Sequence, residues 1–331
     1  MMNFRSSMWC AVSALASCAA MLSADVGAQS ASTAWPVRPI RLIMPFPPGG
    51  ATDANARALA KEMESFLGQP LVVDNRGGAN AIIGSDIVAK AAPDGYTLMH
   101  VSVAFAINPS THKQLPFDTV RDFTPITNPV VGHGAVLAVH PSVAARSVTE
   151  LIALAKKQQL IFSSPGVGNV LHLINEAFNL RAGIRMLHVP YKGSAPALVA
   201  VLGAEVQVMV VPGLTAIPHV RSERLRGLGY SGAKRLDALP NVPTIAEAGL
   251  SGFQQDTGWH AWFAPAKTPE SIVSRIYSAI HQSLQLPKLR EYFLTGGYEP
   301  VADPPAVFQK NFQADLKRWG ELVRLAKITP E

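Results

Sequence analysis

Cysteine is almost absent from this chain of 331 residues, which has only Cys10 and Cys18, both within the first 28 residues. A fold held together by disulfides is therefore excluded for the remainder, which must rely on a hydrophobic core, as a chain of this length can. Charged residues make up only 16% of the sequence and aromatic residues 7%, whereas hydrophobic residues make up 48%. This composition is typical of a globular protein and excludes intrinsic disorder.

Long basic runs are also lacking. The 29 Lys and Arg residues exceed the 23 Asp and Glu residues and give a net charge of +6, yet no basic run is longer than Lys156-Lys157 or Lys317-Arg318. Nucleic-acid binding generally needs a basic stripe with interleaved aromatic residues. We therefore expect no nucleic-acid partner.

The motifs of several enzyme classes are missing as well. The chain has no G-x-S-x-G nucleophile elbow, no Walker A sequence and no H-E-x-x-H zinc motif. Gly166-Val167-Gly168 begins a dinucleotide-like pattern, but its third glycine is replaced by Leu171. We therefore expect no catalytic residue, no metal and no cofactor. Five histidines far apart in the sequence are expected to be structural, and these are His140, His172, His188, His219 and His260.

The first 28 residues have the composition of a secretory signal. The uncharged stretch from Met8 to Leu22 is followed by the small residues Val26-Gly27-Ala28, and its 15 residues are fewer than the ~20 that span a bilayer. Cleavage after Ala28 predicts a soluble periplasmic chain that begins at Gln29. A lipid anchor on Cys18 is the alternative, because residues 15–18 resemble a lipoprotein processing box.

From Arg38 onward, short β-branched runs bounded by Gly or Pro alternate with amphipathic helical patterns, which predicts an α/β fold with parallel sheets. The first set has strands at 38–46, 71–74 and 96–101 and helices at 53–67 and 83–91. The pattern restarts near residue 136, with strands at 136–139, 160–163, 186–189, 206–211 and 225–230 and helices at 147–158, 169–180 and 195–202.

This restart predicts two domains. Domain 1 comprises residues 35–131 and 260–331, and domain 2 comprises residues 132–259. The segments 126–139 and 259–264 are the expected hinge crossings, and we expect the two last helices, beginning near 269 and 304, to pack on domain 1.

Two loops that each join a strand to a helix are the best candidates for a binding site. Residues 46–53 contain Gly49-Gly50, and residues 163–169 contain Gly166 and Gly168. Paired glycines let the backbone approach a ligand, and the free N–H groups of the following helix favour an anion. The plainer interpretation of Asp53 is a helix N-cap. In α/β proteins ligands gather at the carboxyl ends of strands, so both loops could line one cleft.

Five ordered sequence blocks resemble the Bug-type, TctC-like solute-binding proteins, the periplasmic receptors of tripartite tricarboxylate transporters. Besides Trp35-Pro36, the matching blocks are RPIRLIMPFPPGGATD at 38–53, VVDNRGGANAIIGSDIVAKAAPDGYTL at 72–98, SSPGVGNVLHL at 163–173, HVPYKGSAPAL at 188–198 and LPNVPTIAEAGLSGF at 239–253. The resemblance covers nearly the whole mature length.

The resemblance implies a two-domain periplasmic binding protein of the Venus-flytrap, type II-like class, with two hinge crossings. Its domains would close on a small carboxylate, held largely by backbone groups and ordered waters. The ligand-binding residues that it implies are Phe46, Pro48, Gly49, Gly50, Thr52, Asp53, Ser102, Val103, Ala104, Ser163, Ser164, Gly166, Gly168, Asn169 and Tyr191.

The function that follows is an exported, monomeric receptor that delivers its ligand to the membrane permease subunits of a tripartite transporter. Dicarboxylates, tricarboxylates, acidic amino acids and aromatic acids all remain open as ligands. The alternatives are an exported α/β hydrolase-like enzyme, for which the sequence supplies no catalytic spacing, and a ligand-sensing binding protein for a signalling partner.

Overall fold

The computed structural model describes residues 35–325, 328 and 330, so the expected signal peptide, Cys18 and Gln29 lie outside the described residues. The chain divides after Val37 into two units, and the second unit, residues 38–331, contains all the elements below. No helix in the described part of the chain is both long and apolar enough to cross a membrane.

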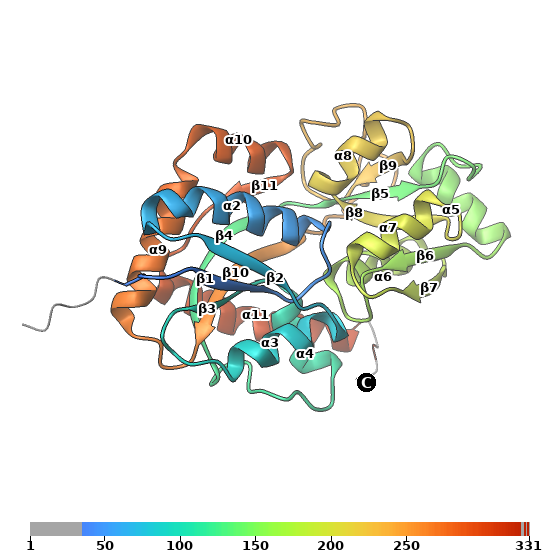
Figure 1. The fold of residues 1–331 in the computed structure, drawn as a ribbon. Helices are drawn as coiled ribbons and strands as arrows, with labels where there is room; N and C mark the ends of the chain where they lie inside the picture. The colour runs from blue at the N-terminus through green and yellow to red at the C-terminus, as the bar shows by residue number, and fades with distance from the viewer. Residues whose placement is uncertain (1–34, 326–327, 329, 331) are drawn as a thin grey trace, which may run out of the picture. The chain divides into compact units, whose positions relative to one another are not determined.

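A first sheet of six strands has the order β11-β4-β10-β3-β1-β2 (Figure 1). Strand β1 pairs in parallel with β2 and β3, whereas β10 runs antiparallel to both β3 and β4, and β11 runs antiparallel to β4. The strands are β1 Ile40–Met44, β2 Leu71–Asn75, β3 Thr97–Ser102, β4 Phe123–Gly132, β10 Gly258–Pro265 and β11 Tyr298–Pro300.

A second sheet of five strands has the order β7-β6-β8-β5-β9. Strands β7, β6 and β8 are parallel, and β5 is antiparallel to β8 and β9. The strands are β5 Ala135–Val139, β6 Ile161–Ser164, β7 Leu187–Pro190, β8 Val208–Pro212 and β9 Arg226–Tyr230.

Both sheets are therefore mixed: the expected parallel strands are present in each, and antiparallel strands are added for a topological reason. The chain leaves the first sheet at the end of β4 and starts β5 three residues later, and it returns to the first sheet at the start of β10. Strand β5 begins at the crossing, beside the end of β8, and therefore runs antiparallel to β8. In the same way β10 begins at the returning crossing, beside the end of β3, and runs antiparallel to β3.

The first crossing is at residues 133–134. The second was expected at 259–264, but those residues lie within β10, and the return precedes Gly258.

We call the first sheet with its helices the first lobe, and the second sheet with its helices the second lobe. Helices α2 and α9 pack on each other, α9 also packs on β4, and α11 packs on α4 and β4, as expected for the last helices. The first lobe has the helices α2 Ala51–Leu67, η1 Ala79–Ala81, α3 Ile82–Ala89, α4 Ala104–Thr111, α9 Glu270–Leu284, α10 Pro287–Thr295 and α11 Pro305–Leu325. The second has α5 Val148–Lys157, α6 Val170–Ala182, α7 Ser194–Leu202 and α8 Gly213–Arg221.

The core of the first lobe is a cluster of aromatic rings that fixes α11 against the sheet. Phe312 of α11 stacks on Phe105 of α4 at 5.8 Å between ring centroids, and Phe263 of β10 contacts both rings. Trp259 and Trp262 are buried on β10. Each phenylalanine buried in this way contributes about 1.5–3 kcal/mol, so the C-terminal helix is firmly part of this lobe.

Candidate ligand-binding site

A cavity of about 40 Å³ lies where the carboxyl ends of the parallel strands of the two lobes face each other. This volume exceeds the ~10–15 Å³ that one water requires but is far below the ~300 Å³ or more of a ligand pocket, so the two lobes are close together here. The first lobe and the returning crossing contribute Phe46, Pro47, Gly50, Ala51, Thr52, Asp53, Ser102, Thr257, His260 and Tyr298, and the second lobe contributes Pro165, Asn169, Val170, Leu171, Ser194 and Pro212.

Four helices begin at this cavity. Ala51, Val170 and Ser194 are the first residues of α2, α6 and α7, and Pro212 precedes α8. The N-cap residues of α2, α7 and α8 make no side-chain capping hydrogen bond. The first N–H groups of these three helices are therefore not capped by the side chain of the N-cap residue. Free N–H groups and the positive ends of helix dipoles favour an anion.

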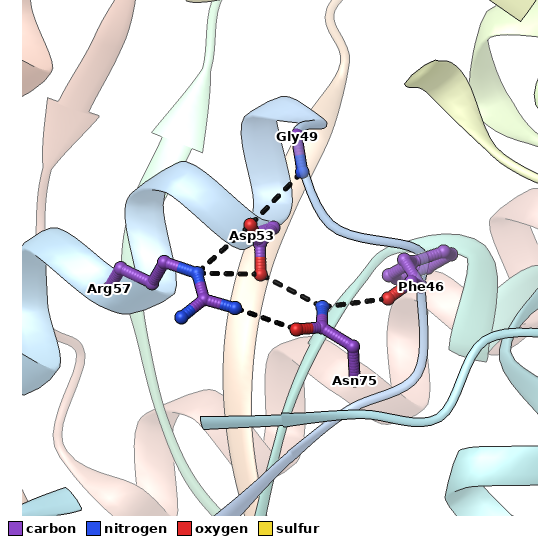
Figure 2. A network of polar contacts seen from close by, with 5 residues as sticks. All are labelled: Phe46, Gly49, Asp53, Arg57 and Asn75. Carbon is purple, nitrogen blue, oxygen red and sulfur yellow. Dashed lines mark hydrogen bonds and ion pairs between the residues drawn. The ribbon is translucent and has the colours of Figure 1, made fainter. Parts of the chain in front are cut away.

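Asp53 fixes the shape of the loop that precedes α2, and Figure 2 shows its contacts. Its carboxylate accepts hydrogen bonds from the Gly49 N–H at 3.1 Å, from Asn75 Nδ2 at 2.9 Å and from Arg57 Nε at 3.1 Å. Asn75 Nδ2 also donates to the Phe46 carbonyl oxygen at 3.0 Å. Burial raises the pKa of Asp53, but these hydrogen bonds and the charge of Arg57 outweigh it and lower the pKa.

Asp53 is therefore not the N-cap of α2, which is Gly50, but the third residue of the helix. Its carboxylate is fully engaged by its neighbours and serves to hold the loop. The sequence interpretation missed Arg57 and Asn75 in this role. The i,i+4 spacing of Asp53 and Arg57 is a signal that could have identified the pair.

The first-lobe wall of the cavity combines the apolar Phe46, Pro47 and Ala51 with polar side chains, among which Asp53 carries the charge. His260 Nε2 lies 3.3 Å from Thr52 Oγ1, and His260 Nδ1 lies 3.0 Å from Asn55 Nδ2. Burial lowers the pKa of His260 to about 3, so its ring is neutral at pH 7. Thr257 Oγ1 is buried and has no hydrogen-bond partner among the described residues. No lysine or arginine of the described chain lines the cavity.

His260 was expected to be merely structural, and sequence reasoning missed its place at the cavity. Its strand, β10, is buried along its whole length, so no alternation of polar and apolar residues marks the face that meets the cavity.

The second-lobe loop reaches the cavity through Pro165 and Asn169. Asn169 is the N-cap of α6, because its Oδ1 accepts from the Leu171 N–H at 3.1 Å. Ser163 and Ser164 instead bond within their own lobe, Ser163 Oγ to the Ala197 carbonyl oxygen at 3.1 Å. The loop is thus shaped by internal hydrogen bonds.

The structure brings six of the residues expected at the ligand to the cavity, namely Phe46, Gly50, Thr52, Asp53, Ser102 and Asn169. The others lie outside its lining: Pro48, Gly49, Val103, Ala104, Ser163, Ser164, Gly166, Gly168 and Tyr191. The reasons are local. Val103 and Ala104 are fully buried at the start of α4, and Tyr191 packs against the second-lobe core.

The two lobes touch beside the cavity through a chain of three asparagines. Asn169 Nδ2 donates to Asn80 Oδ1 at 3.2 Å, Asn80 Nδ2 donates to Asn108 Oδ1 at 2.9 Å, and Asn108 Nδ2 donates to the Asn80 carbonyl oxygen at 2.8 Å. Asn80 and its neighbours Ala79 and Ala81 have φ of 48°, 45° and 81°. Such left-handed conformations cost about 1–3 kcal/mol each outside glycine and cluster at functional sites.

Two glycines let the lobes approach more closely than any side chain would allow. A Cβ at Gly193 of the second lobe would lie 2.7 Å from Pro47 Cδ of the first, and a Cβ at Gly168 would lie 2.5 Å from Thr111 Cγ2. Both glycines also have positive φ, of 116° and 72°. Glycine is therefore required at these positions by backbone conformation and by space.

A family model described as the tripartite tricarboxylate transporter family receptor matches residues 55–328. The chain is also 36% identical to protein BugT of Bordetella pertussis over 307 residues, which make up 91% of this chain and 93% of BugT. The chain belongs to this receptor family.

Solved structures agree with the assignment. Rpa4515 of R. palustris with adipate has a TM-score of 0.85 and 31% identity, covering 90% of this chain and all of that one. MatC (Rpa3494) from Rhodopseudomonas palustris with bound malate has a TM-score of 0.80 and 28% identity, covering 87% of this chain and all of that one. The expected fold, a two-domain α/β periplasmic binding protein, is confirmed.

The comparisons also decide the class of function. Receptors of this family are periplasmic solute-binding proteins and not enzymes, and this chain is a solute-binding receptor of a transporter. The hydrolase-like and signalling interpretations are not favoured.

Proposed function

We propose that this receptor captures a small carboxylate in the cleft between domain 1, which corresponds to the first lobe, and domain 2, which corresponds to the second lobe. The bounds expected from the sequence, residues 35–131 with 260–331 and residues 132–259, differ from the lobes at Gly132 and at the start of β10. The receptor acts as a soluble monomer, released into the periplasm by cleavage after Ala28. It delivers the carboxylate to the membrane permease subunits of a tripartite transporter.

The observation that carries this proposal is the convergence of four helix N-termini on one cavity that no lysine or arginine of the described chain lines. Their N–H groups favour an anion, and in a water-excluded cleft each charge-assisted hydrogen bond is worth about 1.5–3 kcal/mol. The unpartnered Thr257 Oγ1 offers a further polar contact. Adipate and malate, bound by the two related proteins, are both dicarboxylates, which makes dicarboxylates the first ligands to test.

Ligand entry requires the lobes to separate, because the present cavity of about 40 Å³ is smaller than a ligand pocket by roughly an order of magnitude. A ligand that contacts both lobes stabilises the closed arrangement and shifts the population toward it. Solution scattering with saturating adipate or malate is therefore expected to show compaction.

The deciding experiment is chemical unfolding of the purified receptor with adipate, malate, citrate, glutamate and benzoate. An acid present at 100 times its Kd is expected to raise the free energy of unfolding by about 2.7 kcal/mol. The matched controls are the amides of the same acids, which keep the size but lose the charge. The proposal fails if no acid stabilises the receptor, or if an amide stabilises it as much as its acid.

A further inference from the structure

Three parallel rings lie beneath the second-lobe loop. Phe162 of β6 and His188 of β7 occupy paired positions in the sheet and stack at 4.8 Å between centroids. His172 of α6 stacks on His188 at 3.9 Å, with 14° between the ring planes. The stack places two imidazoles face to face, and each contacts one end of residues 164–168.

The first imidazole holds the end of the loop. His172 Nδ1 accepts a hydrogen bond from the Gly168 N–H at 3.2 Å, which requires that Nδ1 carry no proton. Gly168 is the residue that packs against Thr111 of the other lobe, and Asn169, which follows it, lines the cavity. The imidazole therefore fixes the backbone immediately before the ligand-facing asparagine.

The second imidazole holds the beginning of the loop. His188 Nε2 lies 2.6 Å from Ser164 Oγ, which also lies 3.2 Å from the Gly166 N–H and 3.1 Å from the Gly166 carbonyl oxygen. A hydroxyl has one proton, so all three contacts are hydrogen bonds only if His188 Nε2–H and the Gly166 N–H donate to Ser164 and Ser164 donates to the carbonyl. His188 thereby completes the turn around Pro165.

Glu176, one turn after His172 on α6, is a charged neighbour of the pair. Glu176 Oε1 lies 3.7 Å from His172 Nε2. Burial alone would raise the pKa of Glu176, but its interactions with His172, Asn179 and His188 together outweigh burial and lower it. Burial, together with the nearby His172, lowers the pKa of His188 to about 4, against a smaller opposing effect of Glu176, so the His188 ring is neutral at pH 7.

We propose that His172 and His188 are positioning residues for ligand binding: through Gly168 and Ser164 they hold the 164–168 turn in the shape that presents Pro165 and Asn169 to the cavity. This inference rests on the proposed function, since the turn matters only if the cavity binds the carboxylate. The expectation that both histidines are merely structural is thereby replaced by a specific role.

The test compares variants that remove the polar contact with variants that restore it. His172→Leu and His188→Leu keep an apolar side chain in the stack, whereas His172→Gln and His188→Gln return an amide that can accept from Gly168 or donate to Ser164. His219→Leu, on α8 of the same lobe, is the control. The measurements are calorimetric titration with adipate and malate, and the ¹H–¹⁵N amide resonances of Gly166 and Gly168 without ligand.

The leucine variants are expected to weaken ligand binding about tenfold. His172→Leu should shift the amide resonance of Gly168, and His188→Leu should shift that of Gly166. The glutamine variants should largely recover both the affinity and the resonance positions. Wild-type affinity in the leucine variants, or equal loss in the leucine and glutamine variants, would overturn the inference. If a leucine variant does not fold, Ser164→Ala, a change of one atom, must show the same loss for the inference to stand. If the wild-type receptor binds none of the acids, the proposed function is refuted. The positioning role is tested separately, because unchanged Gly166 and Gly168 resonances in the leucine variants refute it whether or not the receptor binds an acid.

Discussion

Replacing Gly168 with alanine should weaken ligand binding by an overlap between the lobes, separately from the cost of the substitution to folding. The new Cβ would lie 2.5 Å from Thr111 Cγ2, about 1 Å closer than an ordinary carbon contact. This overlap exists only while the lobes are together, and overpacking of this kind costs about 1–3 kcal/mol. Affinity for adipate or malate should therefore fall roughly 5- to 150-fold. The strain of a left-handed alanine, about 1–2 kcal/mol, affects folding whether the lobes are apart or together and does not alter affinity.

The matched control is Gly183→Ala at the end of α6. Gly183 also has a positive φ, of 62°, but no atom lies within 4 Å of its Cβ position, so this variant carries the strain without the overlap. Titration calorimetry should show wild-type affinity for Gly183→Ala. In the double variant Gly168→Ala/Thr111→Ser, residue 111 no longer has a Cγ2 atom, so ligand affinity should partly recover. Undiminished binding by Gly168→Ala, or an equal loss in Gly183→Ala, would refute the reasoning.

Three further outcomes are expected. Asn169→Ser keeps an N-cap for α6 but loses the 3.2 Å bond to Asn80, so adipate affinity should fall about 2- to 10-fold; unchanged affinity would show that the asparagine contact does not support closure. The pKa of His260 is lowered to about 3 in the folded protein. As the pH falls, this histidine therefore takes up a proton in the unfolded chain before it does so in the folded protein. His260 alone should thus lower the free energy of unfolding by about 1.4 kcal/mol per pH unit as the pH falls from 6.5 to about 3, and should add no pH dependence above pH 6.5. Burial also lowers the pKa values of His100, His188 and His219, which add slopes of their own, so the measured quantity is a difference: in urea titrations the pH dependence of His260→Gln should be weaker than that of the wild type by about 1.4 kcal/mol per pH unit. Mass spectrometry of the periplasmic product should give a chain that starts at Gln29, whereas an acylated Cys18 would contradict the cleavage site.

The sequence predicted amphipathic helices and strands that form short apolar runs bounded by Gly or Pro. Helix α2 appears at the expected position because its apolar residues repeat with a helical period, and strands β1, β2 and β3 appear because each is such a bounded run. The sequence also predicted that loops 46–53 and 163–169 lie at one cavity, because each loop follows the carboxyl end of a strand.

Elements without such a period were missed. In α4, residues 104–108 are completely buried, and Pro109 lies inside the helix, so no amphipathic pattern is present. Helix α8 likewise contains Pro218. Most of strand β4 was taken for part of the crossing expected at 126–139, although it pairs along both edges; Pro125 and Pro129 lie within it, where proline is unusual for a paired strand. Contacts such as those of His172 with Gly168 depend on packing between segments and have no local signature.

The close approach of the lobes at Gly168 and Gly193 also limits how the specificity of such a receptor can evolve. A side chain at either glycine would hold the lobes apart for every ligand, so these positions offer no route to a new preference. Thr257 and His260 differ, because each presents a side chain to the cavity from the first lobe or the returning crossing. Divergence toward new carboxylates is therefore expected to proceed by substitutions on that wall, while the glycine contacts stay fixed as the common closing surface.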